Sequence, residues 1–371
     1  MLQRKFRQAK SPDFFMFFVL ITLLGIGVVM VFSATSISAY QTYGDSFRFL
    51  KRQLGWSVVG VTTMLFVMKI DYHKYLKWAP KFLLLSIVLL IVLLIPGVGR
   101  EVKGSTRWIV LGPLPPLQVS EVAKVAMVVY VARYISLKDQ KMKKFWGGLL
   151  QPLVILGVVF GLIMLQPDLG TAVTIAGTIM VMFIAGGAKI LHIGGLGSLA
   201  VPGIFYMIIT EPYRLRRLLS FLDPWEDPLG TGFHIIQSLY ALGSGGLFGA
   251  GLGKSRQKFF YLPEPGTDFI FSVLGEELGF IGIFTVIALY FLFAWRGLQT
   301  ALYAEDLFGS MLAVGITTMI TLQAIINMAV VSGSMPVTGI TLPFISYGGS
   351  SLVFMLIGVG ILLNVSCYTT N

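Results

Sequence analysis

The sequence predicts an all-α polytopic membrane protein with ten transmembrane helices and a long extracytoplasmic loop between the seventh and the eighth. Composition is the first reason, because the 371 residues are 56% hydrophobic and only 12% charged, outside the range of soluble globular domains. Run length is the second, because several apolar runs reach the roughly 20 residues that a helix needs to cross about 30 Å of hydrocarbon. The alternating segments of about 10 residues that form membrane barrels are absent.

The apolar runs set the order of the predicted helices. They cover residues 13–35, 54–70, 79–96, 118–137, 146–165, 168–186, 190–210, 268–295, 307–331 and 346–366. The first run could also be a secretory signal, because basic residues precede it. It is longer than a typical signal core, however, and no A-x-A cleavage site follows it, so we predict a transmembrane helix. We expect residues 1–371 to form a single membrane domain.

Basic residues predict the orientation of the helices. Cytoplasmic loops carry an excess of Lys and Arg, and one face of the predicted bundle carries Lys69, Lys74, Lys77, Lys81, Arg133, Lys138, Lys141, Lys143 and Lys144 together with the basic N-terminus. Both termini are therefore expected in the cytoplasm.

The opposite face also carries positive charge, notably Arg48, Lys51, Arg52, Arg100, Lys103, Arg107, Arg214, Arg216, Arg217, Lys254, Arg256 and Lys258. One interpretation is that the loop at about 211–267 is long, and long loops tolerate positive charge. The other is that the outer face binds an anion, for which Arg forks and Lys charges suit phosphate.

Several classes of function are disfavoured by composition. The net charge of +11 could indicate nucleic-acid binding, but the basic residues lie in short loops and form no stripe with interleaved aromatic residues. Cys367 is the only cysteine, so no intrachain disulfide can form, and the three histidines are too scattered to indicate a zinc or iron site.

The predicted long loop contains a candidate short helix between Gly232 and Leu242. Phe233, Ile236, Leu239 and Tyr240 would share one helical face, opposite His234 and Ser238, which is typical of a helix at the membrane surface or one that dips into the protein. The glycines that follow form no dinucleotide-binding fingerprint, because no strand precedes them. They are expected to permit tight turns and close backbone approach.

Asp268 is the strongest candidate for chemistry. It stands at the head of a predicted transmembrane helix, and Ser272, Gly275, Glu276 and Gly279 follow on the same face. A carboxylate inside hydrocarbon is costly unless it faces a cavity or a partner, so this stripe should face inward. A helix-start role, with Thr267 as N-cap, is the alternative. A general base is the functional interpretation, provided that desolvation raises the pKa of this carboxyl.

Three other features stand out. Glu121 and Lys124 are three residues apart on one helical face. They form either a structural ion pair or a pair in which Lys124 meets an anionic substrate. Arg107, beside Trp108, contacts substrate or only extends to the interface. Asp168, in Gln166-Pro-Asp-Leu-Gly-Thr171, has the position of a residue that stabilises a helix start.

Several of these motifs together resemble the SEDS family, whose members include FtsW, RodA and SpoVE. The resemblance covers nearly the whole chain. It rests on Asp223-Pro-Trp-Glu-Asp-Pro-Leu-Gly, Gly246-Leu-Phe-Gly-Ala-Gly-Leu-Gly, Tyr261-Leu-Pro-Glu, Thr267-Asp-Phe-Ile-Phe, Gly275-Glu-Glu-Leu-Gly, Pro336-Val-Thr-Gly-Ile-Thr-Leu-Pro-Phe and Ser346-Tyr-Gly-Gly-Ser-Ser. Details such as Ser255-Arg-Gln-Lys-Phe-Phe-Tyr look most similar to the FtsW and SpoVE branch.

The resemblance implies a peptidoglycan glycosyltransferase that polymerises lipid II on the outer face of the bacterial cytoplasmic membrane. It makes Asp268 the base that takes the proton from the 4-hydroxyl of the acceptor N-acetylglucosamine. That oxygen attacks the anomeric carbon of the donor N-acetylmuramic acid with inversion, and undecaprenyl pyrophosphate leaves. The candidate substrate-binding residues are Arg107, Glu121, Lys124, Asp168, Arg52, Arg214, Lys258, Glu264, Thr267 and Ser346.

The family also implies partners. We expect a class B penicillin-binding protein as transpeptidase, because nothing in this chain could form peptide crosslinks, and other division or sporulation proteins. No cofactor is identified; acidic residues near a diphosphate could bind magnesium or manganese, but no ligand spacing marks a metal site. A lipid II flippase and a non-enzymatic scaffold are the alternatives to the polymerase. Polar residues in a helix bundle also suit a translocation path, but Arg107, Lys124, Asp168 and Asp268 all map to the outer half.

Overall fold

Helices in the structure coincide with every predicted apolar segment. The computed structural model describes residues 10–369 apart from 103–104, 111–115 and 260. The long helices are α1 (Phe14–Tyr43), α2 (Arg48–Met68), α3 (His73–Val92), α4 (Val119–Lys138), α5 (Leu150–Met164), α6 (Leu169–Ala185), α7 (Ile190–Ile209), α10 (Ile270–Tyr303), α11 (Leu307–Val331) and α12 (Gly349–Ser366). A 3₁₀ turn (Asp139–Lys141) and a π-helical turn (Phe145–Leu149) connect α4 to α5. The helix boundaries differ from the predicted ones by up to eight residues.

Among the described residues, six helices are both long and apolar enough to cross a bilayer: α1, α3, the segment Phe145–Met164 that includes α5, α10, α11 and α12. Helix α6 and the first part of α7 are apolar but shorter. Many large apolar side chains on the outside of the bundle are exposed, among them Phe18 of α1 and Phe66 of α2 at 67% and 66%. An outer surface of this kind suits lipid, and the chain is a multi-pass membrane protein.

A small sheet precedes α4, so the all-α prediction is incomplete. Strands β1 (Gly99–Val102), β2 (Ser105–Ile109) and β3 (Leu117–Gln118) form an antiparallel sheet in the order β1-β2-β3. The strands are only two to five residues long, so this segment was too short to show a period-2 pattern in the sequence.

The predicted loop at 211–267 contains two helices, α8 (Pro212–Leu222) and α9 (Phe233–Ser244). The predicted short helix is confirmed as α9, which ends at Ser244 rather than at Leu242. Ser238 is buried and its hydroxyl bonds to the Ser272 hydroxyl at 2.7 Å and donates to the Val331 carbonyl at 2.6 Å. Leu239 and Tyr240 are exposed instead. Hydrogen bonds of Ser238 therefore attach the polar face of α9 to α10 and α11.

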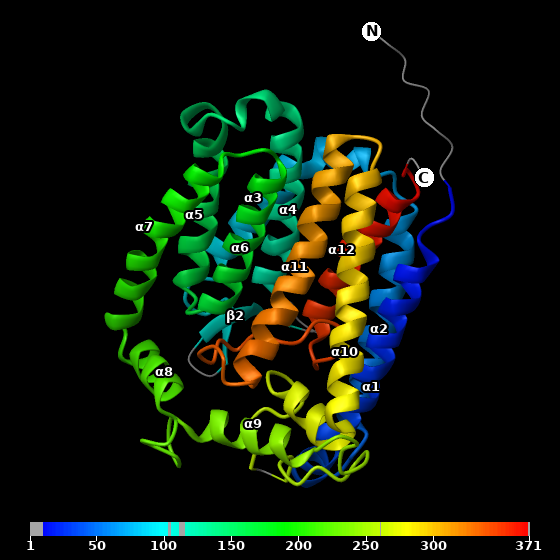
Figure 1. The fold of residues 1–371 in the computed structure, drawn as a ribbon, viewed down its shortest axis with the longest axis vertical. Helices are drawn as coiled ribbons and strands as arrows, with labels where there is room; N and C mark the ends of the chain where they lie inside the picture. Colours follow the sequence, from blue (N-terminus) through cyan, green and yellow to red (C-terminus); the bar gives the residue numbers. More distant parts are fainter. Residues whose placement is uncertain (1–9, 103–104, 111–115, 260, 370–371) are drawn as a thin grey trace.

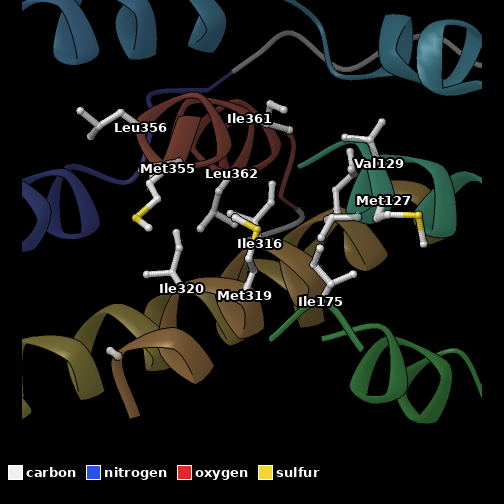
Figure 2. Close-up of a cluster of buried hydrophobic side chains, with 14 of the residues drawn as sticks. Met127, Val129, Ile175, Ile316, Met319, Ile320, Met355, Leu356, Ile361 and Leu362 are labelled. Atoms are coloured by element: carbon white, nitrogen blue, oxygen red, sulfur yellow. The ribbon is translucent and has the colours of Figure 1, made fainter. Parts of the chain in front are cut away.

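Helix α11 is the centre of the bundle. It packs against α10, α4, α6 and α12, and Figure 2 shows its Ile316 and Met319 among side chains of the neighbouring helices, such as Ile175 of α6 and Met355 of α12. By contrast, α7 makes its main contacts with only α6 and α8 and stands at the edge of the bundle in Figure 1.

The two ends of the bundle differ in architecture. The start of α1, the α10–α11 connection and the end of α12 lie at one end, whereas β2, α9 and the start of α10 lie at the other (Figure 1). At the first end, the Asn364 side chain of α12 accepts a hydrogen bond from the Tyr72 N–H at 2.8 Å and donates to the Met68 carbonyl at 2.7 Å. Nearby, Asp306 begins α11 and its carboxylate contacts His73 Nε2 at 2.9 Å.

Candidate active site

Asp268 lies in a turn immediately before α10. The helix begins at Ile270, its N-cap is Phe269, and neither a side-chain cap nor an acidic residue is found in the first turn. The helix-start interpretation of Thr267 and Asp268 is therefore wrong in this structure. Asp268 is half-buried.

The loop between α11 and α12, residues 332–348, encloses the backbone around Asp268. From within α11, the Asn327 amide nitrogen donates to the Asp268 carbonyl at 2.8 Å. The Ser346 hydroxyl donates to the Thr267 carbonyl at 2.6 Å. Gly339 approaches so closely that a Cβ added to it would lie 3.7 Å from the Asp268 carboxylate. Two side chains thus hold the consecutive main-chain carbonyls of Thr267 and Asp268 in place.

The predicted neighbours of Asp268 partly assemble around it. The Thr267 hydroxyl donates to the exposed carboxylate of Glu264 at 3.0 Å. Ser346 is buried and bonds to both segments, because its hydroxyl also accepts the Leu342 N–H at 2.8 Å. Glu264, Thr267 and Ser346 therefore lie with Asp268, as predicted for parts of one site. Whether they contact substrate stays a prediction.

Lys124 is connected to the same loop through an amide. Its ammonium forms an ion pair with Glu121 at 2.8 Å and donates to the side-chain oxygen Oε1 of Gln323 at 2.6 Å. The Gln323 amide nitrogen in turn donates to the Thr341 carbonyl at 3.0 Å. Both charged side chains of the pair are at most 5% exposed. The predicted ion pair is confirmed, and contact with an anionic substrate stays a prediction.

Arg107 and Asp168 form a second connected pair. Asp168 caps α6, because its carboxylate accepts the Thr171 N–H at 3.2 Å and the Thr171 hydroxyl at 2.9 Å. The predicted helix-start role is confirmed. Arg107 lies 3.6 Å from this carboxylate and also donates to the carbonyls of Gln166 and Pro167. An arginine of β2 thereby holds the start of α6.

Helix α8 brings further positive charge to the loop at 332–348. Arg217 donates to the Val337 carbonyl at 2.9 Å, and Arg214 lies half-buried one turn earlier. Val337 is two residues from Gly339, which adjoins Asp268. Guanidinium groups suit diphosphate oxygens, and the arrangement therefore suits a reaction with an anionic leaving group.

Two other predicted residues lie outside this arrangement. Lys258 is buried, and its ammonium contacts Glu277 at 2.9 Å and donates to the Ser33 hydroxyl at 3.2 Å. Arg52 is exposed on the first turns of α2. Contact between Arg52 and substrate stays a prediction. Contact between Lys258 and substrate would require the Lys258–Glu277 ion pair to break.

Asn327, Gln323 and Arg217 are the residues that sequence reasoning missed. Asn327 and Gln323 are four residues apart within an apolar helix, and both are at most 2% exposed. Two buried amides on one face of such a helix are a signal that could have been read. No comparable signal separates Arg217 from Arg214 and Arg216. Among the described residues, no group of three or more His, Cys, Asp or Glu side chains could hold a metal ion.

Together, the fold and the site define a multi-pass helical membrane protein with a half-buried carboxylate at one end, beside a loop contacted by arginine and linked to a buried lysine. The family model described as cell cycle protein, which covers FtsW, RodA and SpoVE, matches residues 14–371. The chain belongs to this family, which confirms the resemblance seen in its motifs.

Individual relatives are similar over almost their full length. Stage V sporulation protein E of Bacillus subtilis (strain 168) is 50% identical over 359 residues, which are 97% of this chain and 98% of that protein. The probable peptidoglycan glycosyltransferase FtsW of Geobacter sp. (strain M18) is 46% identical over 360 residues, again 97% and 98%.

Solved structures share the fold. A chain from a peptidoglycan synthase complex, described for its structural coordination of polymerization and crosslinking, matches with a TM-score of 0.79 and 32% identity over 96% of this chain and 98% of that one. The crystal structure of the rod shape determining protein RodA of Thermus thermophilus matches with a TM-score of 0.72 and 29% identity over 97% and 98%.

Proposed function

We propose that the chain is a peptidoglycan glycosyltransferase that polymerises lipid II into glycan strands in cell division or spore cortex synthesis. The observation that carries the proposal is the placement of Asp268. Its backbone is held outside the helix by Asn327, and the loop beside its carboxylate is contacted by Arg217 and linked through Gln323 to Lys124. Relatives named as peptidoglycan glycosyltransferases and the peptidoglycan synthase complex support the same activity.

The proposed reaction joins two lipid II molecules. The Asp268 carboxylate accepts the proton of the acceptor 4-hydroxyl as that oxygen forms a bond to the anomeric carbon of the donor. The bond from the anomeric carbon to the diphosphate breaks on the opposite side, with inversion, and its electron pair leaves with undecaprenyl pyrophosphate. Fixed positive charge lowers the barrier where this negative charge develops, which is the role we assign to Arg107, Arg214, Arg217 and Lys124.

We propose that the chain crosses the membrane ten times, with both termini in the cytoplasm and the site on the outer face. The predicted spans coincide with α1 to α7 and α10 to α12, and α8 and α9 then belong to the extracytoplasmic loop. The start of α10 lies at the opposite end of the bundle from the start of α1 and the end of α12 (Figure 1), which supports this orientation.

We propose a class B penicillin-binding protein as the partner that crosslinks the polymer, alongside other division or sporulation proteins. The similarity to a chain of a peptidoglycan synthase complex supports a partner of this kind. No cofactor is assigned, and a role for Mg²⁺ or Mn²⁺ is tested by comparing polymer formation with and without a chelator.

The polymerase is tested with the purified full-length chain, its cognate penicillin-binding protein and lipid II. We expect glycan polymer from the wild type and none from Asp268→Asn at equal protein level. Asp45→Asn is the matched control, because this carboxylate pairs with Lys51 at 2.9 Å on an exposed surface, and its activity should be unchanged. Robust polymerisation by Asp268→Asn would refute the assignment. Transfer of lipid II between vesicle leaflets without any polymer would favour the flippase.

A further inference from the structure

The helix that follows Asp268 is interrupted at Gly279. Its backbone adopts φ 65° and ψ −163° there, a conformation that is essentially restricted to glycine. Residues 270–277 before the interruption are all buried, whereas Phe280 and Phe284 after it are 56% and 62% exposed. The interruption therefore separates an inner helical segment, which is buried next to Asp268, from an outer segment that has an exposed apolar face.

A second segment of the chain replaces the helical hydrogen bonds at this point. In an uninterrupted α-helix, the N–H groups of Phe280 and Ile281 would donate to the carbonyls of Glu276 and Glu277, four residues earlier. They donate instead to carbonyls of residues 246–251, at 2.9 and 3.2 Å. The carbonyls of Glu276 and Glu277, in turn, accept two N–H groups from residues 246–251, at 2.9 and 3.0 Å. We call residues 246–251 the inserted loop.

The side chains of the same two glutamates hold the segment that follows the inserted loop. Glu276 accepts the backbone N–H groups of residues 256–257 at 2.8 and 3.3 Å. Glu277 pairs with Lys258 at 2.9 Å and accepts the Ser33 hydroxyl at 2.6 and 2.7 Å. Both glutamates are at most 3% exposed. Their carboxylates are thus occupied by the protein itself, which suits a structural role better than proton transfer.

We propose that the inserted loop, with Glu276 and Glu277, positions Asp268 by keeping α10 interrupted. The proposal rests on the proposed function, because positioning is measured through polymerisation. A continuous helix with a released loop is the alternative arrangement. The interruption sets the direction of residues 270–278 relative to the outer part of α10, and Asp268 lies just before this segment. Restoring the helix would therefore move the carboxylate relative to the loop at 332–348.

Two glycine substitutions test this and a third controls for backbone strain. Gly279→Ala disfavours the interruption, because alanine does not adopt this conformation readily. Gly249→Ala blocks insertion, because its Cβ would overlap the Glu277 carbonyl oxygen. Gly253→Ala is the control: its φ of 80° matches the 77° of Gly249, but a Cβ added there meets nothing within 4 Å. Comparison of the three variants therefore separates the effect of blocking loop insertion from the effect of placing alanine at a positive φ.

Hydrogen exchange followed by mass spectrometry reads the arrangement without any substrate. In Gly279→Ala we expect the amides of Ala250 and Gly251 to lose protection while those of Phe280 and Ile281 keep it, since the re-formed helix protects them. In wild type and Gly253→Ala all four stay protected. If Gly279→Ala lost protection at all four amides, or at none, the proposal that the loop and the continuous helix compete for the same hydrogen-bonding groups would be overturned. This measurement holds even if the chain proves not to polymerise lipid II.

Steady-state polymerisation of lipid II then tests positioning. Gly279→Ala and Gly249→Ala should lose about 100-fold in kcat with KM nearly unchanged, the cost of misplacing a reacting group by about 1 Å. Gly253→Ala should keep its kcat. Glu276→Gln, which retains the shape of the side chain, should lose about tenfold in kcat through its weaker hydrogen bonds to residues 256–257. A released loop with full kcat, or equal losses in Gly249→Ala and Gly253→Ala, would overturn the proposal.

Discussion

Asn327 donates from its amide nitrogen to the main-chain carbonyl of Asp268 at 2.8 Å and to that of Ile340 at 2.7 Å. One buried side chain in the central helix therefore joins the two segments that meet at the site. We expect Asn327→Leu to remove this donor from both carbonyls, and its loss at the buried Ile340 carbonyl should cost about 1–3 kcal/mol. Its kcat for polymerisation should fall by roughly 10- to 100-fold as Asp268 shifts. Unfolding of the purified variant and its polymer yield are the measurements.

Asn364 provides the matched control. It is also a buried amide that bonds two main-chain groups, the Met68 carbonyl and the Tyr72 N–H, but at the other end of the bundle. Asn364→Leu should destabilise the protein by a similar amount and leave kcat per folded molecule unchanged. Equal losses of kcat in the two leucine variants would contradict a specific role for Asn327.

The order of the helices could be predicted because hydrophobic runs of sufficient length have few alternatives in a membrane protein. Their ends were harder to predict, because polar residues such as Arg48 and His73 lie in regular helix beyond the apolar runs. The interruption at Gly279 could not be predicted either. Its cause is a set of hydrogen bonds to a segment some 30 residues earlier in the chain, whereas Gly275 and Gly282 lie in the same sequence region without interrupting the helix.

Local pairs in the candidate site were predictable and long-range ones were not. The Glu121–Lys124 pair and the Asp168 cap depend on residues three apart, a spacing visible in the sequence. The link from Lys124 to Thr341 depends on how α4 and α11 pack. Lys258 shows the same limit, because only the fold brings its ammonium to Glu277 and Ser33.

The Glu121–Lys124 pair offers a test that separates stability from substrate binding. Both side chains are buried, so removing one leaves the other charge uncompensated, at a cost of about 3–5 kcal/mol. Glu121→Leu or Lys124→Met alone should therefore destabilise the protein strongly. The double variant should recover most of the stability, since apolar replacement of a buried pair is often close to neutral. If Lys124 binds an anionic substrate, the stable double variant should still make little polymer. Recovery of polymerisation with stability would make the pair purely structural.

The two roles of Asp168, as the N-cap of α6 and as a charge that faces Arg107, can be tested separately. Asp168→Ala removes the acceptor for the Thr171 N–H and should cost about 1 kcal/mol. Asp168→Asn keeps a good N-cap but removes the charge that faces Arg107 at 3.6 Å, so its stability should be near that of the wild type. Thermal unfolding ranks the three proteins. A polymerisation defect in Asp168→Asn would show that the charge matters to the reaction, whereas equal instability of the two variants would contradict the capping role.

Asp306 predicts a pH dependence of stability. Burial acts to raise the pKa of its carboxyl, but hydrogen bonds from His73 and from the Gly309 N–H outweigh burial and hold this pKa below the ordinary value of 3.8. Because the folded state favours the charged form, this contribution is complete above pH 3.8 and is lost as the pH falls through the lower, folded pKa.

Asp306→Ala should therefore cost about 1–2 kcal/mol at neutral pH, as expected for the loss of an N-cap, and less in strong acid, where the wild-type carboxyl is protonated. Thermal unfolding of both proteins from pH 7 downward measures the difference. Asp45→Ala is the control, because its surface pair with Lys51 is exposed to solvent and should contribute little at any pH. A penalty for Asp306→Ala that stays constant or grows in acid would mean that the neutral carboxyl already supports α11, and that the contact with His73 adds no charge-dependent stability.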